Sequence, residues 1–140
     1  MTNVVTADVE TRTFNVTVDG IAAMDTWLEH LADQWKLSEK AAFGARLCLA
    51  ELAANVLEHG TARSSGSDHI IVTVDRFRDG IEVEFRDSRE SFDPTNPPRL
   101  PEIRDNGGGR GLALLQAFAR DLTYVAEPDC NRTMFRVAST

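Results

Sequence analysis

Two alternating segments joined by a tight turn constrain the fold of this 140-residue chain more than any other feature. Apolar and polar side chains alternate along residues 69–77 and again along residues 80–86, which is typical of strands that bury one face. Asp79 and Gly80, with Arg78 just before them, join the two segments, and Asp-Gly is a strong signal for a two-residue hairpin turn. The two segments therefore predict an antiparallel hairpin.

Similar patterns elsewhere predict further strands and three helices. Ser38 is a good N-cap for the second of these helices. The order β-α-α-β-β-α-β-β predicts a single α+β domain, a two-layer sandwich of a mostly antiparallel sheet with helices on one face. The predicted helices are 21–35 (led in by Asp19 and Gly20), about 39–58 and about 109–120, and the other predicted strands are 12–18, 121–127 and 132–138.

Composition narrows the class of protein. The chain is 42% hydrophobic and 26% charged, as in ordinary globular domains. Its formal net charge of -7 argues against nucleic-acid binding through a broad basic face. No apolar run approaches the roughly 20 residues of a membrane helix, and residues 1–13 carry no secretory signal. Two cysteines far apart in the sequence fit a reducing compartment, so we expect a cytoplasmic protein.

The helix expected at about 39–58 is apolar around most of its circumference, which is typical of a buried helix. Glu51 and Asn55 interrupt this pattern, four residues apart and so on one face. Buried carboxylates and amides are costly unless a partner satisfies them. Either both side chains hydrogen-bond to neighbouring backbone, or they face a cavity where the amide oxygen binds Mg²⁺ and the carboxylate accepts a proton.

Asp87 follows the strand that starts at Gly80. Period two places Asp87 on the same apolar face as Val83 and Phe85. One interpretation is a carboxylate that accepts a hydrogen bond from an exocyclic amine of a flat apolar ligand. The other is an aspartate that caps the start of the following loop. From the residues alone, both interpretations stay open.

Residues 88–108 contain four prolines and form one long connection before a glycine cluster. A connection of about 20 residues without regular structure is usually functional, for example as a lid or a binding loop. The cluster Asn106-Gly107-Gly108-Gly109-Arg110-Gly111-Leu112 opens the third helix. Its backbone N–H groups and the helix N-terminus favour phosphate binding, and a flexible hinge is the alternative. The cluster matches neither a Walker A loop nor the dinucleotide-binding fingerprint.

Taken in order, these motifs resemble the GHKL ATPase superfamily, whose members share the Bergerat ATP-binding fold. Within it, the sequence is similar to the bacterial anti-sigma factor serine/threonine kinases. LCLAELAANVLEHG is similar to their N box, DSRESFDP to their first glycine box and GGGRGLALLQAFARDLTY to their second. The resemblance extends over about residues 12–138, essentially the whole chain.

The resemblance implies ATP or ADP with Mg²⁺ as cofactors, and a role for each matching residue. Asn55 would hold the Mg²⁺, and Glu51 would be the general base that accepts a proton from a serine hydroxyl of a partner. Asp87 would accept a hydrogen bond from the adenine amine, and residues 93–108 would form the ATP lid. The residues that would bind the phosphates are Gly107, Gly108, Gly109, Arg110, Gly111 and Leu112.

Arg89 departs from the family pattern, because the first glycine box usually has glycine at this position. An arginine would crowd the base, lie against its ring or reach the phosphates, so we include Arg89 among the nucleotide-binding residues. The departure affects the expected nucleotide affinity more than the expected fold.

The resemblance implies an ATP-dependent protein serine/threonine kinase that acts as an anti-sigma factor. Such a protein would phosphorylate an anti-anti-sigma protein of the STAS type, sequester a sigma factor and act as a homodimer, without binding nucleic acid or membrane. The alternative is a non-catalytic module of the same fold that sequesters partners with weak or no nucleotide turnover. Arg89 favours the module, whereas the pair of Glu51 and Asn55 favours the kinase.

Overall fold

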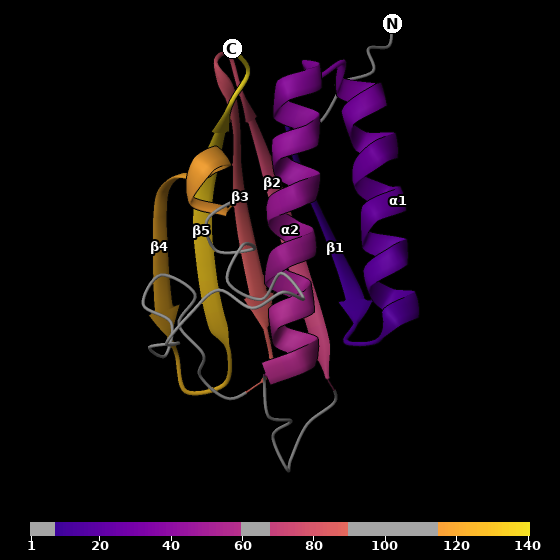
Figure 1. Cartoon of the computed structure of the whole chain (residues 1–140), viewed down its shortest axis with the longest axis vertical. Coiled ribbons are helices and arrows are strands. Elements are labelled where there is room, and N and C mark those ends of the chain that lie inside the picture. Colours follow the sequence, from indigo (N-terminus) through magenta and orange to yellow (C-terminus); the bar gives the residue numbers. More distant parts are fainter. Residues whose placement is uncertain (1–7, 60–67, 90–114) are drawn as a thin grey trace, which may run out of the picture.

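The computed structural model describes residues 8–59, 68–89 and 115–140 and has the two layers expected from the sequence. Figure 1 shows both long helices on one face of a twisted sheet. A further helical turn covers residues 115–118. The elements are β1 (Val9–Asn15), α1 (Val18–Trp35), α2 (Glu39–His59), β2 (His69–Phe77), β3 (Gly80–Asp87), β4 (Arg120–Ala126) and β5 (Asn131–Ala138).

The sheet has the strand order β1-β2-β3-β5-β4, and all pairings between these strands are antiparallel. The predicted hairpin joins β2 to β3, but Phe77 lies opposite Gly80, so the two-residue turn is Arg78-Asp79 and not the expected Asp79-Gly80. A Cβ atom at Gly80 would lie 2.2 Å from the carbonyl oxygen of Val137, so the turn and β5 approach closely because no side chain intervenes. At the other end of β3, Asp87 pairs with Ile70 on one side and Asn131 on the other.

The boundary between β1 and α1 corrects the prediction of a strand over residues 12–18. β1 ends at Asn15, while Val18 begins α1 and is 73% exposed. Thr17 explains the boundary, because its Oγ1 accepts a hydrogen bond from Gly20 N at 2.9 Å and so caps the helix. Asp19 and Gly20 lie in the first turn of α1, where they were expected to precede it.

α2 packs one face on the sheet and α1, which corrects the prediction of a helix buried nearly all round. Phe43 is 58% exposed and Ala50 is also exposed, because a two-layer fold leaves the outer side of its helices in solvent. Ser38 caps α2 as predicted, since its Oγ accepts from Ala41 N at 3.1 Å. The buried residues of α2 recur at helical spacing: Ala41, Ala45, Cys48, Leu49, Leu52, Ala53 and Val56.

The opposite face of the sheet carries charged side chains. Glu82 pairs with Arg136 at 3.1 Å, and Arg132 lies 2.9 Å from Glu127 and 3.6 Å from Glu84. Exposed pairs of this kind each contribute little stability, so the apolar rows beneath the helices set which face is buried. In the part of the chain that the structure describes, neither helix combines the length and apolar character needed to cross a membrane.

The described part of the third predicted helix is the turn at residues 115–118, packed through the buried Leu115. β4 already begins at Arg120, so the predicted helix end at residue 120 is too late. Residues 109–114 lie outside the described residues. A Cβ atom at Gly44 would lie 2.8 Å from Val137 Cγ1 and 3.3 Å from Phe118 Cδ1, so this glycine allows α2 to approach β5 and the short turn.

Candidate functional site

α2 presents Glu51 and Asn55 on one face, and both side chains are half-buried where the sequence predicted full burial. Within the described residues, neither side chain hydrogen-bonds to another residue. The interpretation in which both groups are satisfied by neighbouring backbone therefore finds no support in this part of the chain. As far as residues 8–59, 68–89 and 115–140 show, the carboxylate and the amide have no hydrogen-bond partner in the protein.

The environment of Glu51 makes it a better proton acceptor than a fully solvated carboxylate. Burial raises the pKa of Glu51, and the negative charge of Glu58 two turns later raises this pKa further. A raised pKa brings a carboxylate closer to the range that suits a general base. The neighbouring Cys48 is fully buried, and burial followed by the charge of Glu51 raises the pKa of its thiol to about 12. Cys48 therefore stays protonated and does not compete as a nucleophile.

Asn55 carries a donor of the kind that binds a Mg²⁺ ion shared with a phosphorylated ligand. Among residues 8–59, 68–89 and 115–140, no cluster of three or more His, Cys, Asp or Glu side chains is placed to hold a metal ion. Mg²⁺ is commonly bound through one or two protein oxygens together with substrate phosphates. The amide oxygen of Asn55 is a hard donor of this kind, so Asn55 is the residue that would hold the ion.

Asp87 lies on the core face at the end of β3, as period two predicted, and is 7% exposed. Its Oδ1 accepts hydrogen bonds from Arg89 N at 3.0 Å and from Asn131 Nδ2 at 3.1 Å. The first of these bonds is the loop-capping role that one interpretation expected. The second fixes the carboxylate to β5, since a buried carboxylate needs donors to offset its lost hydration. Acceptance of a hydrogen bond from an adenine amine stays a prediction.

Asn131 is a residue of this cluster that sequence reasoning missed. It is 1% exposed, its Nδ2 also donates to Arg89 O at 2.7 Å, and its Oδ1 accepts from Tyr124 Oη at 2.8 Å. A signal was present in the sequence, because period two in β5 places Asn131 on the same buried row as Phe135 and Val137. A polar residue on an apolar row indicates a specific partner.

The Arg89 side chain turns towards α2 and the start of β2, and it is 13% exposed. Its Nη2 lies 3.0 Å from Asp68 Oδ2, and its Nη1 donates to the carbonyl oxygen of Val56 at 3.3 Å. Whether Arg89 crowds the base, lies against its ring or reaches the phosphates stays a prediction. Asp68 gave no signal in the sequence, because it lies in a segment that reads as a loop by composition.

These contacts bring the predicted residues of α2 and β3 to the same end of the molecule. Figure 1 shows the C-terminal end of α2 beside the end of β3, and the bond from Arg89 to Val56 joins the two. We call this region, formed by Glu51, Asn55, Asp87, Arg89 and Asn131, the Asp87 end. The predicted phosphate-binding residues 107–112 and the predicted lid 93–108 lie outside the described residues.

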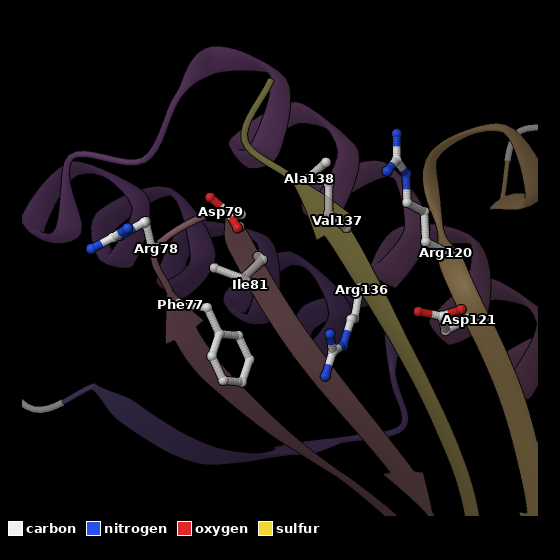
Figure 2. Close-up of a pocket in the computed structure, with 10 residues that line it drawn as sticks. Phe77, Arg78, Asp79, Ile81, Arg120, Asp121, Arg136, Val137 and Ala138 are labelled. Carbon is white, nitrogen blue, oxygen red and sulfur yellow. The ribbon is translucent and has the colours of Figure 1, made fainter.

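A hollow of about 500 Å³ lies at the opposite end of β3, around Gly80 and Ala138. We call this region the Gly80 end. Figure 2 shows that the side chains of Arg78, Arg120 and Arg136 point in different directions there. Guanidinium groups that diverge do not form a compact anion site, so the hollow lacks the convergent polar groups of a typical ligand pocket.

Comparisons with known proteins agree with the fold. A family model described as the histidine kinase-like ATPase domain matches residues 14–137. The solved structure of the RsbU and RsbW domains of Rv1364c from Mycobacterium tuberculosis is similar, with a TM-score of 0.67 and 10% identity over 95% of this chain. This chain spans 33% of that one, so the likeness shows the fold. A search of curated proteins finds no significant match.

Proposed function

This chain belongs to the family of histidine kinase-like ATPase domains, and we propose that it is an ATP-dependent protein serine/threonine kinase of the anti-sigma type. The observation that carries the proposal is the buried carboxylate of Asp87, held by Asn131 beside the end of α2 that presents Glu51 and Asn55. The order of the sequence motifs, similar to that of anti-sigma factor kinases, supports the finer assignment.

Three residues of the Asp87 end have proposed roles towards the substrates. Asp87 accepts a hydrogen bond from the adenine amine, and Asn55 holds the Mg²⁺, which when bound neutralises charge on the phosphate oxygens. Glu51 accepts the proton of a serine hydroxyl. The serine oxygen bonds to the terminal phosphorus of ATP, and the bond between this phosphorus and ADP breaks. Positioning and charge neutralisation account for most of the catalysis in phosphoryl transfer, so one base with a raised pKa suits this chemistry.

The proposed partners follow from the sequence resemblance. The phosphoacceptor is a serine on an anti-anti-sigma protein of the STAS type, and the sequestered partner is a sigma factor. A homodimer in the cytoplasm, a lid at residues 93–108 and phosphate binding by residues 107–112 are proposals of the same kind.

Phosphoryl transfer to a STAS protein tests the proposal. The wild-type chain, with labelled ATP and Mg²⁺, is expected to phosphorylate a serine of the cognate STAS protein. Glu51→Ala and Asn55→Ala are expected to lower the transfer rate by about 100-fold or more, because each removes a group that acts on the reacting atoms. Arg78→Ala at the Gly80 end is the control and should retain the wild-type rate. Unchanged transfer in both Glu51→Ala and Asn55→Ala would refute the mechanism.

A non-catalytic binding module is the second candidate, and Arg89 is the observation that favours it. A nearly buried arginine stands where related proteins usually have glycine, which alters the backbone path available to a bound base. A module of this kind would bind a sigma factor or a STAS protein without phosphorylating it. Its melting temperature would also be unchanged by millimolar ATP with Mg²⁺, whereas a chain that binds ATP in its folded state must be stabilised by it.

A further inference from the structure

Arg89 contacts the Asp87 end through its backbone. Its N–H donates to Asp87 Oδ1 at 3.0 Å, and its carbonyl oxygen accepts from Asn131 Nδ2 at 2.7 Å. Asn131 Nδ2 also donates to Asp87 Oδ1 at 3.1 Å. The peptide groups on both sides of the Arg89 Cα therefore help to fix the carboxylate that is proposed to bind adenine, and any residue except proline can supply them at position 89.

The side chain of Arg89 contacts the end of α2. α2 ends at His59, so the carbonyl of Val56 belongs to the last four of the helix, which have no partner further along it. Arg89 Nη1 donates to this carbonyl at 3.3 Å, and Arg89 Nη2 pairs with Asp68 Oδ2 at 3.0 Å. A cation at a helix C-terminus is favourable, and Asp68 fixes its position because the pair is largely shielded from water.

The residue next to Val56 is Asn55, the proposed Mg²⁺ ligand. We propose that Arg89 is a positioning residue that joins the two halves of the nucleotide site. Its backbone sets Asp87, and its side chain holds the turn of α2 that carries Asn55. This inference rests on the proposed nucleotide binding, and it gives the arginine that replaces a family glycine a function in the same site.

The test measures ADP affinity by calorimetry in Mg²⁺ and in EDTA, so that the two halves are read separately. Arg89→Ala keeps the backbone contacts to Asp87, so its affinity in EDTA is expected to stay within about twofold of wild type. The gain in affinity on adding Mg²⁺ is expected to fall by about tenfold or more, as is common when a residue that orients a metal ligand is removed. Arg89→Lys should restore part of this gain, because an ammonium still caps the helix end.

Arg46→Ala is the matched control. Arg46 also lies on α2 and forms a two-bond pair with Asp25, at 2.9 and 2.7 Å, but far from the C-terminal end. This variant should lose stability while keeping the full Mg²⁺-dependent gain, which separates positioning from general destabilisation. Asp68→Asn leaves Arg89 in place, and its gain in ADP affinity on adding Mg²⁺ should lie between those of wild type and Arg89→Ala. If Arg89→Ala does not fold, Asp68→Asn tests the positioning role.

The outcomes distinguish the two proposals. If Arg89→Ala keeps the full Mg²⁺-dependent gain in ADP affinity, the positioning role is wrong and nucleotide binding is unaffected. The same holds for Asp68→Asn if Arg89→Ala does not fold. An equal loss of gain in Arg46→Ala also overturns it, because the effect is then one of stability. A wild-type chain that binds no ADP in either buffer overturns the proposed function, and the positioning role with it.

Discussion

The Gly80 end and the Asp87 end are the two ends of the same strand, β3, and they differ in how their polar groups are arranged. At the Gly80 end, a wide hollow is lined by arginines whose side chains diverge, and the glycine serves the close approach of two backbones. At the Asp87 end, a carboxylate, an amide and an arginine converge through short hydrogen bonds. Convergence of buried polar groups, rather than the size of a hollow, is the reason for placing the proposed nucleotide site at the Asp87 end.

Loss of the Asp87 carboxylate should change the stability and the ADP affinity of the protein the most. Asp87→Ala leaves the buried amide of Asn131 without this acceptor, so the free energy of unfolding should fall by about 2 kcal/mol. ADP affinity should fall by about tenfold or more, because the proposed hydrogen bond to the adenine is lost. Urea unfolding and calorimetry measure the two quantities. A folded Asp87→Ala protein that binds ADP as tightly as wild type would show that the Asp87 end does not bind the nucleotide through this carboxylate.

A side chain at Gly80 should affect stability without affecting the ligand. Gly80→Ala places a Cβ atom 2.2 Å from the Val137 carbonyl oxygen, so the turn or β5 must shift, at a cost of about 2 kcal/mol in unfolding free energy. ADP affinity of the folded variant should match wild type, because the altered contact lies at the far end of β3. A substantial fall in affinity would show that the two ends are not independent.

The pH dependence of stability should trace partly to Glu51. Since the pKa of this carboxyl is raised in the folded state by burial and by Glu58, its ionised form opposes folding at pH values above the raised pKa. That penalty disappears as the pH falls through the raised pKa towards the ordinary value. Glu51→Gln should therefore be more stable than wild type at neutral pH, by no more than about 1 kcal/mol.

The difference in unfolding free energy between Glu51→Gln and wild type should shrink on acidification and close at about pH 3, below the ordinary pKa of the carboxyl, where both side chains are neutral. Urea titrations at several pH values measure it. Glu58→Gln provides the control, because it removes the second cause of the shift and should narrow the difference. A Glu51→Gln protein that is less stable than wild type at neutral pH would contradict the raised pKa.

Removal of a guanidinium from the hollow at the Gly80 end should change stability and ADP affinity the least. Arg120 is exposed at the start of β4 and makes no ion pair with the described residues. Arg120→Ala should change the free energy of unfolding by less than about 0.5 kcal/mol, as is usual for surface substitutions, and should leave ADP affinity unchanged. Thermal melting and calorimetry check both quantities, and a clear loss of affinity would assign a ligand role to the Gly80 end.

Sequence patterns predicted the local parts of the fold well. The alternation that ends at Asp87 and the cap at Ser38 are both observed, because each depends on neighbours within a few residues. The strand predicted through Val18 failed, since Thr17 fits an alternating pattern as well as a helix cap. The many alanines of α2 suggested burial on all sides, but small side chains are also tolerated on an exposed helix face.

The candidate site was predictable where one element carries the pattern. The four-residue spacing of Glu51 and Asn55 and the strand position of Asp87 are local, and both follow from the sequence. The partners of Asp87 and Arg89 are not local, because the register of β3 with β5 places Asn131 beside Asp87 across 44 positions in the chain. Likewise, only the assembled fold brings Asp68 to the guanidinium of Arg89.

The hydrogen bond from Tyr124 to Asn131 has a practical consequence for spectroscopy. Both tryptophans of the sequence, Trp27 and Trp35, lie on α1, with Arg12 and Arg76 over their rings. The single tyrosine, Tyr124, donates its hydroxyl proton to an amide that touches Asp87. Tryptophan emission therefore reports whether α1 is docked, whereas tyrosine absorbance reports the β4 edge of the sheet, so one unlabelled sample carries separate optical signals for the two.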